Sequence, residues 1–265
     1  MPFFEEKMSD VNNVEILKHW DLCVKILGKH LHTGTTLINV VMKVIQKAFK
    51  IKESKIIQAA YGSWMVLMDN FALNPVILNN LKRIKLLMKL FVVPNSNSYS
   101  EAAVTQKFNA WWHLIFLLGP NVSVFCDIVL VPFLRFCYGP KYSSKCPSDV
   151  LNDKDQSPMT PLSPAKKYSG LDKLCLDALV QLFASRPLST AIPKTHLSGS
   201  LKNTVFTYDS AMGNAEVIFH ALLEATALTK PSNRSELVKL EAVWEGVSKV
   251  LHEAAIDNKL NEEGE

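Results

Sequence analysis

The sequence has few cysteines, and their spacing is not that of a metal site or a disulfide framework. The five in 265 residues form no Cys-x-x-Cys pair and do not lie beside a histidine at metal-ligand spacing. An odd number without a framework fits a reducing compartment. The five are Cys23, Cys126, Cys137, Cys146 and Cys175. We therefore expect no metal site, and we expect the four that lie in apolar surroundings to be small buried hydrophobes.

The sequence also lacks the motifs of common catalytic and nucleotide-binding sites. It contains no G-x-x-x-x-G-K-[ST], G-x-G-x-x-G, G-x-S-x-G or H-E-x-x-H. The seven histidines are scattered, and the one H-x-H pair, His30 and His32, lies near a predicted helix end, where capping is the simplest role. These absences predict a protein that is not an enzyme and needs no cofactor.

Long uninterrupted apolar runs are missing as well. The N-terminal MPFFEEKMSD has neither a basic nor an apolar region of a signal peptide. The most membrane-like segment, 113–138, is interrupted at Gly119-Pro120, Asn121 and Asp127 before about 18 apolar residues accumulate. We expect two core helices there and no membrane partner.

Helical periodicity fills most of the remaining sequence. Hydrophobic residues make up 48% of the chain, and they recur at i, i+3, i+4 and i+7 in at least four segments. The third of these contains Ile57, Ala60, Tyr61, Trp64, Met68 and Phe71, and the fourth contains Ile77, Leu81, Ile84, Met88 and Phe91. Pro75, Pro120 and Pro140 mark turns between helices. The pattern predicts an all-α fold built from antiparallel helical hairpins.

A faint internal repeat refines this prediction. Trp20, Trp64 and Trp111 are separated by 44 and 47 residues, and each is followed seven residues later by a large apolar residue. A period of about 40–47 residues with two helices per unit is typical of HEAT and armadillo solenoids. The alternative is a generic helical bundle in which the spacing is coincidental.

Composition divides the chain into four parts. Residues 10–138 form a first helical-repeat part, and residues 139–170 are rich in Ser, Pro, Lys and Asp and are expected to be disordered. Residues 171–258 form a second helical part, in which 186–204 is a second loose stretch. Two long helices are expected at about 206–228 and 233–257, the latter capped by Ser232 or Asn233 with Glu236 as the capping-box acid. Residues 259–265 are expected to fray.

Two features are candidates for binding or regulation. The first is a basic set in the fourth helix: Lys82, Arg83, Lys85 and Lys89. Its lysines share a stripe opposite the apolar face, so the set is either a solvated outer face or a binding site for DNA phosphates or a phosphorylated peptide. The second is SPMTPLSPAKK, which places three proline-directed phosphorylation sites in the predicted disordered loop: Ser157, Thr160 and Ser163.

Several of these segments resemble the N-terminal helical-repeat region of the Rap-interacting factor (Rif) family, the telomere-associated Rif proteins. The similarity lies in DNFALNPVIL at 69–78, KRIKLLM at 82–88, VKILGKHLH at 24–32 and AAYGSW at 59–64. It continues through Trp111-Trp112, LGP at 118–120 and Pro132, and SPMTP lies where family members carry a proline-rich insertion. The resemblance covers roughly residues 15–185.

The resemblance implies a nuclear, non-enzymatic scaffold in telomere maintenance, replication timing, cell-cycle control and double-strand break repair. Its helical repeats would dock on DNA, telomeric chromatin or a phosphorylated damage-response adaptor. Family members recruit type 1 phosphatase, but the chain has no [KR]-x-V-x-F motif, because KNTVF at 202–206 places valine directly before phenylalanine. Family proteins are also much longer, and Lys89 stands where the family has proline.

A second functional hypothesis stays open at this stage. A generic helical-repeat adaptor would bind a partner helix in an apolar groove without touching nucleic acid. The two hypotheses differ in what they require of Lys82, Arg83, Lys85 and Lys89, which must be exposed on one surface and unpaired with acids to hold phosphate.

Overall fold

The computed structural model describes residues 14–32, 35–51, 53–92, 100–139, 168, 170–184, 197, 201, 213–230 and 232–262. These residues form helices and turns and contain no strand, so the all-α prediction is confirmed for the described part of the chain. The chain divides into two compact units, Met1–Leu118 and Gly119–Glu265. Nearly all of the predicted disordered loop at 139–170 lies outside the described residues, as do Ser157, Thr160 and Ser163.

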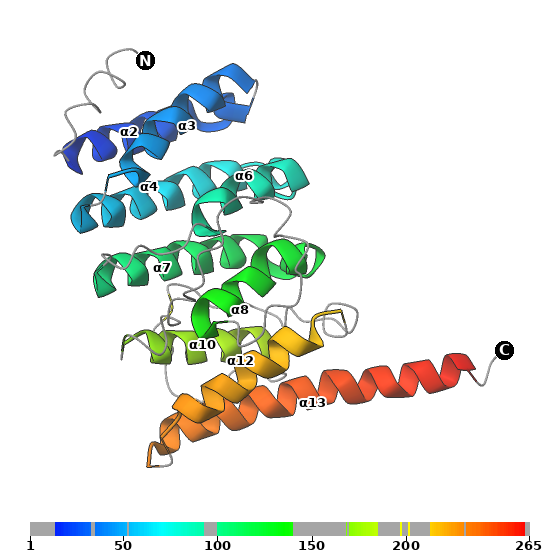
Figure 1. Cartoon of the computed structure of the whole chain (residues 1–265). Helices are drawn as coiled ribbons and strands as arrows, with labels where there is room; N and C mark the ends of the chain where they lie inside the picture. The colour runs from blue at the N-terminus through cyan, green and yellow to red at the C-terminus, as the bar shows by residue number, and fades with distance from the viewer. Residues whose placement is uncertain are drawn as a thin grey trace, which may run out of the picture. The chain divides into compact units, whose positions relative to one another are not determined.

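The first unit is a set of helices that follow one another along the chain with short connections (Figure 1). They are α2 (Val14–Leu27), the 3-10 helix η1 (Gly28–His32), α3 (Thr35–Phe49), α4 (Ser54–Ala72), α5 (Pro75–Leu78), α6 (Leu81–Val92) and α7 (Glu101–Leu118). The long helix α4 packs against α2, α3 and α7, which makes it the central element of this unit.

The core of the first unit consists of the residues that the helical period predicts. On α4, Ile57, Trp64 and Phe71 are buried, as is every other member of the predicted face. Trp20 and Trp111 are buried too, and the Trp20 indole Nε1 donates a hydrogen bond of 3.1 Å to the carbonyl of Val41. Because Trp20 lies on α2 and Val41 lies on α3, this bond joins the two helices.

The predicted fourth helix is in fact two helices. The apolar period from Ile77 to Phe91 is interrupted at Asn79-Asn80, which separates the four-residue α5 from α6. Asn80 caps α6, because its Oδ1 accepts a hydrogen bond of 3.0 Å from the backbone N–H of Lys82. As a result Leu81 is 48% exposed, and the expectation that it belongs to the core is wrong.

The second unit contains η2 (Gly119–Phe125), the π-helical turn η3 (Cys126–Leu130), α8 (Val131–Tyr138), α10 (Leu171–Phe183), α12 (Ala215–Leu228) and α13 (Arg234–Glu262). Within it α10 packs against α13, and α12 packs against α8. Residues Cys175 to Phe183 of α10 are all buried, so this helix forms the core of the unit.

The segment 113–138 contains the two core helices that the sequence predicted, the end of α7 and α8, with the break at Gly119, whose φ is 52°. The 3-10 and π turns between Leu118 and Val131 were not predicted. The end of the last helix differs from the expectation. Helix α13 continues to Glu262, past residue 258, where the frayed tail was expected to begin. Asn233 caps α13 as expected, with its Oδ1 accepting a hydrogen bond of 3.3 Å from the N–H of Glu236.

By length and composition, one described stretch could cross a membrane: Glu101–Tyr138, with a mean hydropathy of 2.2 in its most apolar window. Half of that window is buried inside the protein, and the helix is interrupted at Gly119. Buried core helices of soluble proteins have the same composition, so this stretch is weak support for a membrane span.

Candidate functional site

Helix α6 presents its apolar and basic residues on different faces. Ile84, Leu87, Met88 and Phe91 are buried, at the i, i+3, i+4, i+7 spacing of a single helical face. Lys82, Lys85 and Lys89 are exposed. Since residues three, four and seven apart share a side of a helix, the three ammonium groups lie along one outer stripe.

Arg83 is placed differently from the three lysines. Its side chain is half-buried, and its guanidinium carbon lies 5.6 Å from the centroid of the Phe71 ring. A cation at this distance over an aromatic face is attracted by the ring quadrupole. Arg83 therefore joins α6 to the end of α4, and it does not extend the lysine stripe.

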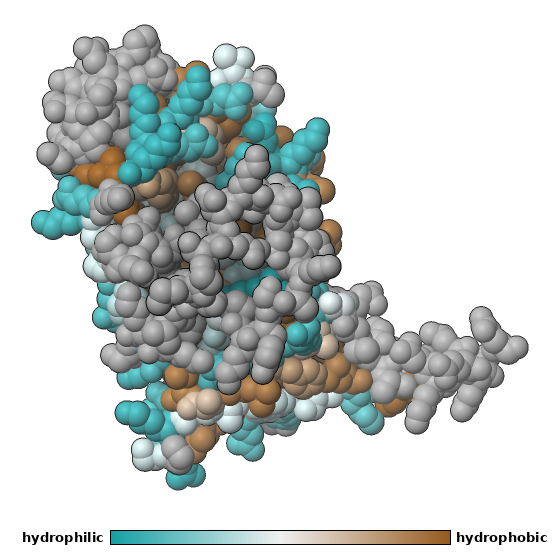
Figure 2. Space-filling view, viewed as in Figure 1, coloured by the Kyte–Doolittle hydropathy of each residue, from teal (hydrophilic) through white to brown (hydrophobic). Residues whose placement is uncertain are grey.

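Within the described part of the chain, Lys82, Lys85 and Lys89 form no ion pair. The first unit, residues 1–118, contains fourteen Lys and Arg and eight Asp and Glu, an excess of six positive charges on a protein whose net charge is +4. Figure 2 shows hydrophilic side chains gathered on the described surface of this unit. We call Lys82, Lys85 and Lys89 together the α6 lysine face.

Such a surface suits an extended anion. Lysine offers a compact charge with three donors on a flexible stem, which suits a row of phosphates; arginine is preferred where one phosphate is gripped in bidentate fashion. The one arginine of the predicted set stacks on Phe71. The arrangement therefore favours contacts with a phosphate backbone over a single bidentate phosphate pocket.

The turn that leads into α6 is built from asparagines. Asn74 adopts an extended conformation before Pro75, and its Oδ1 accepts a hydrogen bond of 3.1 Å from the N–H of Val76. Asn80 repeats this capping role at α6. These caps satisfy backbone donors at the starts of α5 and α6.

Asn70 has a role that periodicity did not predict. It is buried in α4, and its Nδ2 donates hydrogen bonds of 3.1 Å to the carbonyls of Val24 and Gly28 at the end of α2. His32 Nε2 lies 3.0 Å from the Oδ1 of Asn70. The sequence contains one signal of this role: Asn70 is a polar residue on the apolar side of the predicted helix.

Asp69, the neighbour of Asn70, makes a second connection. Its Oδ1 lies 2.6 Å from His113 Nε2 on α7, where the aspartate is largely exposed and the histidine is mostly buried. The motif D-N-F-A-L-N-P thus links α4 to α2, to α7 and, through Phe71 and Arg83, to α6. Its residues connect the helices that surround the α6 lysine face.

One further cation in this unit is buried. Lys107 on α7 is 2% exposed, and burial lowers the pKa of its ammonium group to about 7. A lysine with such a pKa is partly neutral at physiological pH, since desolvation penalises the charged form. It is therefore separate from the exposed lysines that form the α6 lysine face.

The described residues contain no group of three or more His, Cys, Asp or Glu that could hold a metal ion. Cys126, Cys137 and Cys175 are buried free thiols, as the sequence predicted, while Cys23 is half-buried. Burial raises the pKa of the Cys126 thiol to about 12, so this sulfur stays protonated and unreactive at neutral pH.

Comparisons with known proteins identify relatives for the region that contains this site. Residues 3–125 match the family model described as Rap1-interacting factor 1 N terminal. The chain is 29% identical over 233 residues to the human telomere-associated protein RIF1, covering 87% of this chain and 9% of that protein. It is 35% identical over 133 residues to the chicken protein of that name, covering 49% and 6% of the two chains.

For the mouse protein of that name the identity is 37% over 126 residues, which cover 47% of this chain and 5% of the relative. The resemblance to the Rap-interacting factor family is thus confirmed, and the α6 lysine face lies inside the matched region. The chain spans less than a tenth of the length of these curated relatives. No solved structure matches it.

Proposed function

From the match of residues 3–125 to the N-terminal region of Rap1-interacting factors, we propose that this chain is a non-enzymatic helical scaffold that docks on DNA in the nucleus. The observation that carries the proposal is the α6 lysine face, three exposed ammonium groups in a unit, Met1–Leu118, that has six more Lys and Arg than Asp and Glu. A protein that neutralises phosphates with lysines gains affinity by releasing counterions from DNA.

The relatives support the cellular setting of this proposal. They are named telomere-associated proteins, which points to chromosomes and the nucleus as the place of action. Telomere maintenance, replication timing, cell-cycle control and double-strand break repair follow as proposed processes for this chain. Phosphatase recruitment is not part of the proposal, because the docking motif is missing from the sequence.

Titration of the full chain with a duplex oligonucleotide at several salt concentrations tests this function. We expect Lys82→Gln/Lys85→Gln/Lys89→Gln to weaken binding and to reduce the slope of log K against log salt by about 0.9 for each lost phosphate contact. The matched control neutralises three exposed lysines outside α6: Lys25, Lys29 and Lys55.

Equal losses in the two triple variants would show that net charge alone drives binding, and would overturn the α6 lysine face as the site. A phosphorylated peptide in place of DNA distinguishes the other partner class. If the peptide binds through these lysines and the duplex does not, the chain docks on a phosphoprotein and the DNA proposal is wrong.

Phosphorylation of Ser157, Thr160 and Ser163 is a separate proposal, supported by their Ser-Pro and Thr-Pro sequences. Phosphates there would add negative charge to a chain that otherwise binds anions. Incubation of the full chain with a cyclin-dependent kinase, followed by peptide mass spectrometry, should find these residues modified. Unmodified peptides at full coverage of 141–170 would contradict the proposal.

A further inference from the structure

Helix α2 has a second apolar side, away from the one that packs into the first unit. Leu17, Trp20 and Val24 are buried at the spacing of one helical face. Leu22 and Ile26 lie one helical turn apart on the other side, where they are 55% and 73% exposed. The packing of the first unit therefore leaves these two side chains in contact with water.

Basic side chains accompany this second apolar side. Lys18 and Lys25 are exposed, and they lie four residues before and three residues after Leu22, on the same side of α2. The Lys18 ammonium nitrogen lies 2.7 Å from the exposed Glu15 carboxylate, an ion pair of the kind that contributes little to stability. We call Lys18, Leu22, Lys25 and Ile26 the α2 ridge, an apolar strip with a positive edge.

The last two helices of the second unit expose another apolar surface. Phe219 and Leu223, one turn apart on α12, are 37% and 61% exposed. The ring centroid of Phe219 lies 6.3 Å from that of Trp244 on α13, and the Trp244 indole N–H donates a hydrogen bond of 3.4 Å to the Thr226 hydroxyl. These contacts bring residues of two helices onto one surface, and Figure 2 shows hydrophobic side chains over α12 and α13.

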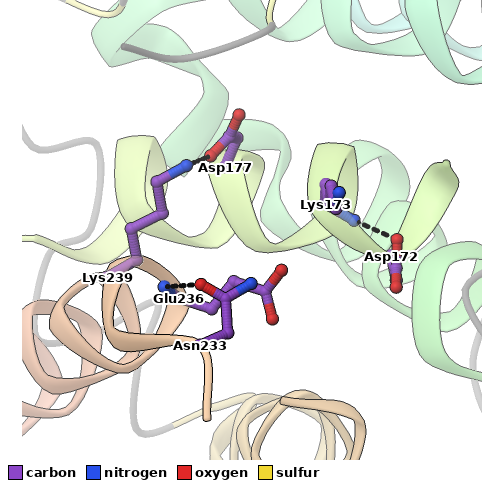
Figure 3. Close-up of polar contacts among 6 residues, drawn as sticks. All are labelled: Asp172, Lys173, Asp177, Asn233, Glu236 and Lys239. Atoms are coloured by element: carbon purple, nitrogen blue, oxygen red, sulfur yellow. Dashed lines mark hydrogen bonds and ion pairs between the residues drawn. The ribbon is translucent and has the colours of Figure 1, made fainter. Parts of the chain in front are cut away.

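Helix α13 uses a different side to pack against α10. Val243 and Val247 are buried, and Lys239 reaches across to Asp177 on α10 in a buried ion pair (Figure 3). Trp244 is only partly buried, because it lies beside this inner side and contacts α12. The outer side of α13 is therefore open to another molecule.

Acidic side chains border the surface of α12 and α13. Leu237, two turns before Trp244 on the same side of α13, is 40% exposed. Glu241 lies between these two residues, and Glu216 lies three residues before Phe219 on α12. Both glutamates are exposed, and neither forms an ion pair with another described residue. We call these residues the α12–α13 patch: Glu216, Phe219, Leu223, Leu237, Glu241 and Trp244.

We propose that the α12–α13 patch of one copy of this chain docks on the α2 ridge of another copy. Each surface has an apolar centre, and the glutamates of the patch meet the lysines of the ridge, so the two surfaces are complementary in charge. A patch packed on a second patch would bring like charges together, as would a ridge packed on a second ridge. Phosphate groups of DNA would be repelled by the glutamates of the patch.

The contact is head-to-tail, because it joins two different surfaces of the same chain. Each pair of copies keeps one unused ridge and one unused patch, so further copies add in the same way unless the arrangement closes into a ring. The interface is small and its lysines and glutamates are exposed, which is typical of a transient association. This proposal is independent of DNA binding through the α6 lysine face.

Sedimentation velocity of the full chain over a range of concentrations, without DNA, tests the proposal. We expect the weight-average mass to increase with concentration above that of a single chain. Leu22→Gln/Ile26→Gln and Leu223→Gln/Leu237→Gln should each weaken association about tenfold, because apolar side chains at the centre of an interface supply most of its affinity.

The matched control for these variants is Val76→Gln/Val124→Gln. It replaces one exposed apolar residue in each unit, 79% and 76% exposed, outside the ridge and the patch. We expect association to stay unchanged in this variant. Equal weakening in the control and in the two test variants would show unspecific apolar aggregation and would overturn the proposal.

Charge reversal tests the pairing of the two surfaces. Lys18→Glu/Lys25→Glu and Glu216→Lys/Glu241→Lys should each weaken association about tenfold. The chain with all four reversals should return to within about threefold of the wild type, because opposite charges then meet again. This recovery is independent of any loss of folding in the single pairs, since a misfolded chain would not regain association.

Three outcomes would overturn the proposal. The first is a chain that stays monomeric at every concentration. The second is association that the patch variants weaken and the ridge variants leave unchanged, which would show that patches pack on one another. The third is a fourfold reversal that associates no better than either pair. Because DNA is absent from these measurements, none of the three outcomes bears on the proposed function.

Discussion

His32 and Asn70 are joined side chain to side chain across 38 residues of sequence, with Nε2 of the histidine 3.0 Å from Oδ1 of the asparagine. The same nitrogen lies 3.1 Å from the backbone carbonyl of Asn70. Because both neighbours are acceptors, Nε2 carries the proton and donates to them. The end of α2 and its 3-10 extension are thereby attached to the middle of the first unit.

This relationship predicts that Asn70→Ala destabilises the first unit. The substitution removes the hydrogen bonds to Val24 and Gly28 and leaves buried helix-end carbonyls without donors. We expect the free energy of unfolding to fall by about 2–4 kcal/mol, measured by urea denaturation. Asn109→Ala on α7 is the control and should change it by less than about 1 kcal/mol; a similar loss in both variants would contradict the role of Asn70.

Arg83 is predicted to stabilise the fold while contributing little to DNA binding. Its guanidinium lies over Phe71, so Arg83→Gln should lower the free energy of unfolding by about 0.5–1 kcal/mol. We expect the salt dependence of duplex binding to stay close to that of the wild type, whereas Lys85→Gln should reduce the slope by about 0.9. A reduced slope for Arg83→Gln would show that it contacts phosphate after all.

Lys107 predicts a stability that increases with pH. The pKa of its ammonium group is lowered to about 7 in the folded chain, while an unfolded lysine titrates near 10.4. Between these values the unfolded state binds more protons than the folded state. The free energy of unfolding therefore falls as the pH is lowered from about 10.4 to about 7. We therefore expect the unfolding free energy of the wild type, minus that of Lys107→Met, to increase by on the order of 1 kcal/mol for each pH unit above pH 7.

Comparison with the variant is needed because buried thiols act in the opposite direction. Burial raises the pKa of Cys126 and Cys137, so above about pH 8.5 the unfolded state loses their protons first. That contribution is the same in wild type and variant and cancels in the difference. Lys55→Met, at an exposed position of α4, is the control, and its difference from wild type should be flat across this pH range.

The buried pair Asp177–Lys239 predicts a large penalty for removing one partner. Both side chains are at least nine-tenths buried, so Asp177→Leu leaves an uncompensated ammonium group and should cost about 3–5 kcal/mol. The double variant Asp177→Leu/Lys239→Met should recover most of this loss, as measured by chemical denaturation.

The exposed pair Lys249–Glu253 provides the contrast for that measurement. Its side chains are more than half exposed and 3.8 Å apart, so Glu253→Gln should change stability by less than about 1 kcal/mol. A double variant at Asp177 and Lys239 that is no more stable than Asp177→Leu alone would show that the ion pair, and not the buried charge, dominates the energetics.

Periodicity predicted much of the fold because a helix that buries one face has apolar residues at regular spacing in the sequence. The buried residues of α4 and the buried tryptophans follow from that spacing alone. The same reasoning was wrong at Leu81, since an apolar residue in register can still be exposed when a local cap begins a new helix next to it. The exposure of Lys82, Lys85 and Lys89 agrees with the predicted stripe, and their contact with phosphate stays a prediction.

The sequence by itself determined the all-α class, the resemblance to the Rap-interacting factor family and the positions of the lysines on α6, because these depend on local spacing and on residue identity. Only the tertiary structure decided that Arg83 lies over Phe71, that Asn70 bonds to the end of α2, and that Phe219 and Trp244 share one surface. Each of these depends on side chains brought together from different helices, and the partner of a buried polar group cannot be read from its own neighbours in the chain.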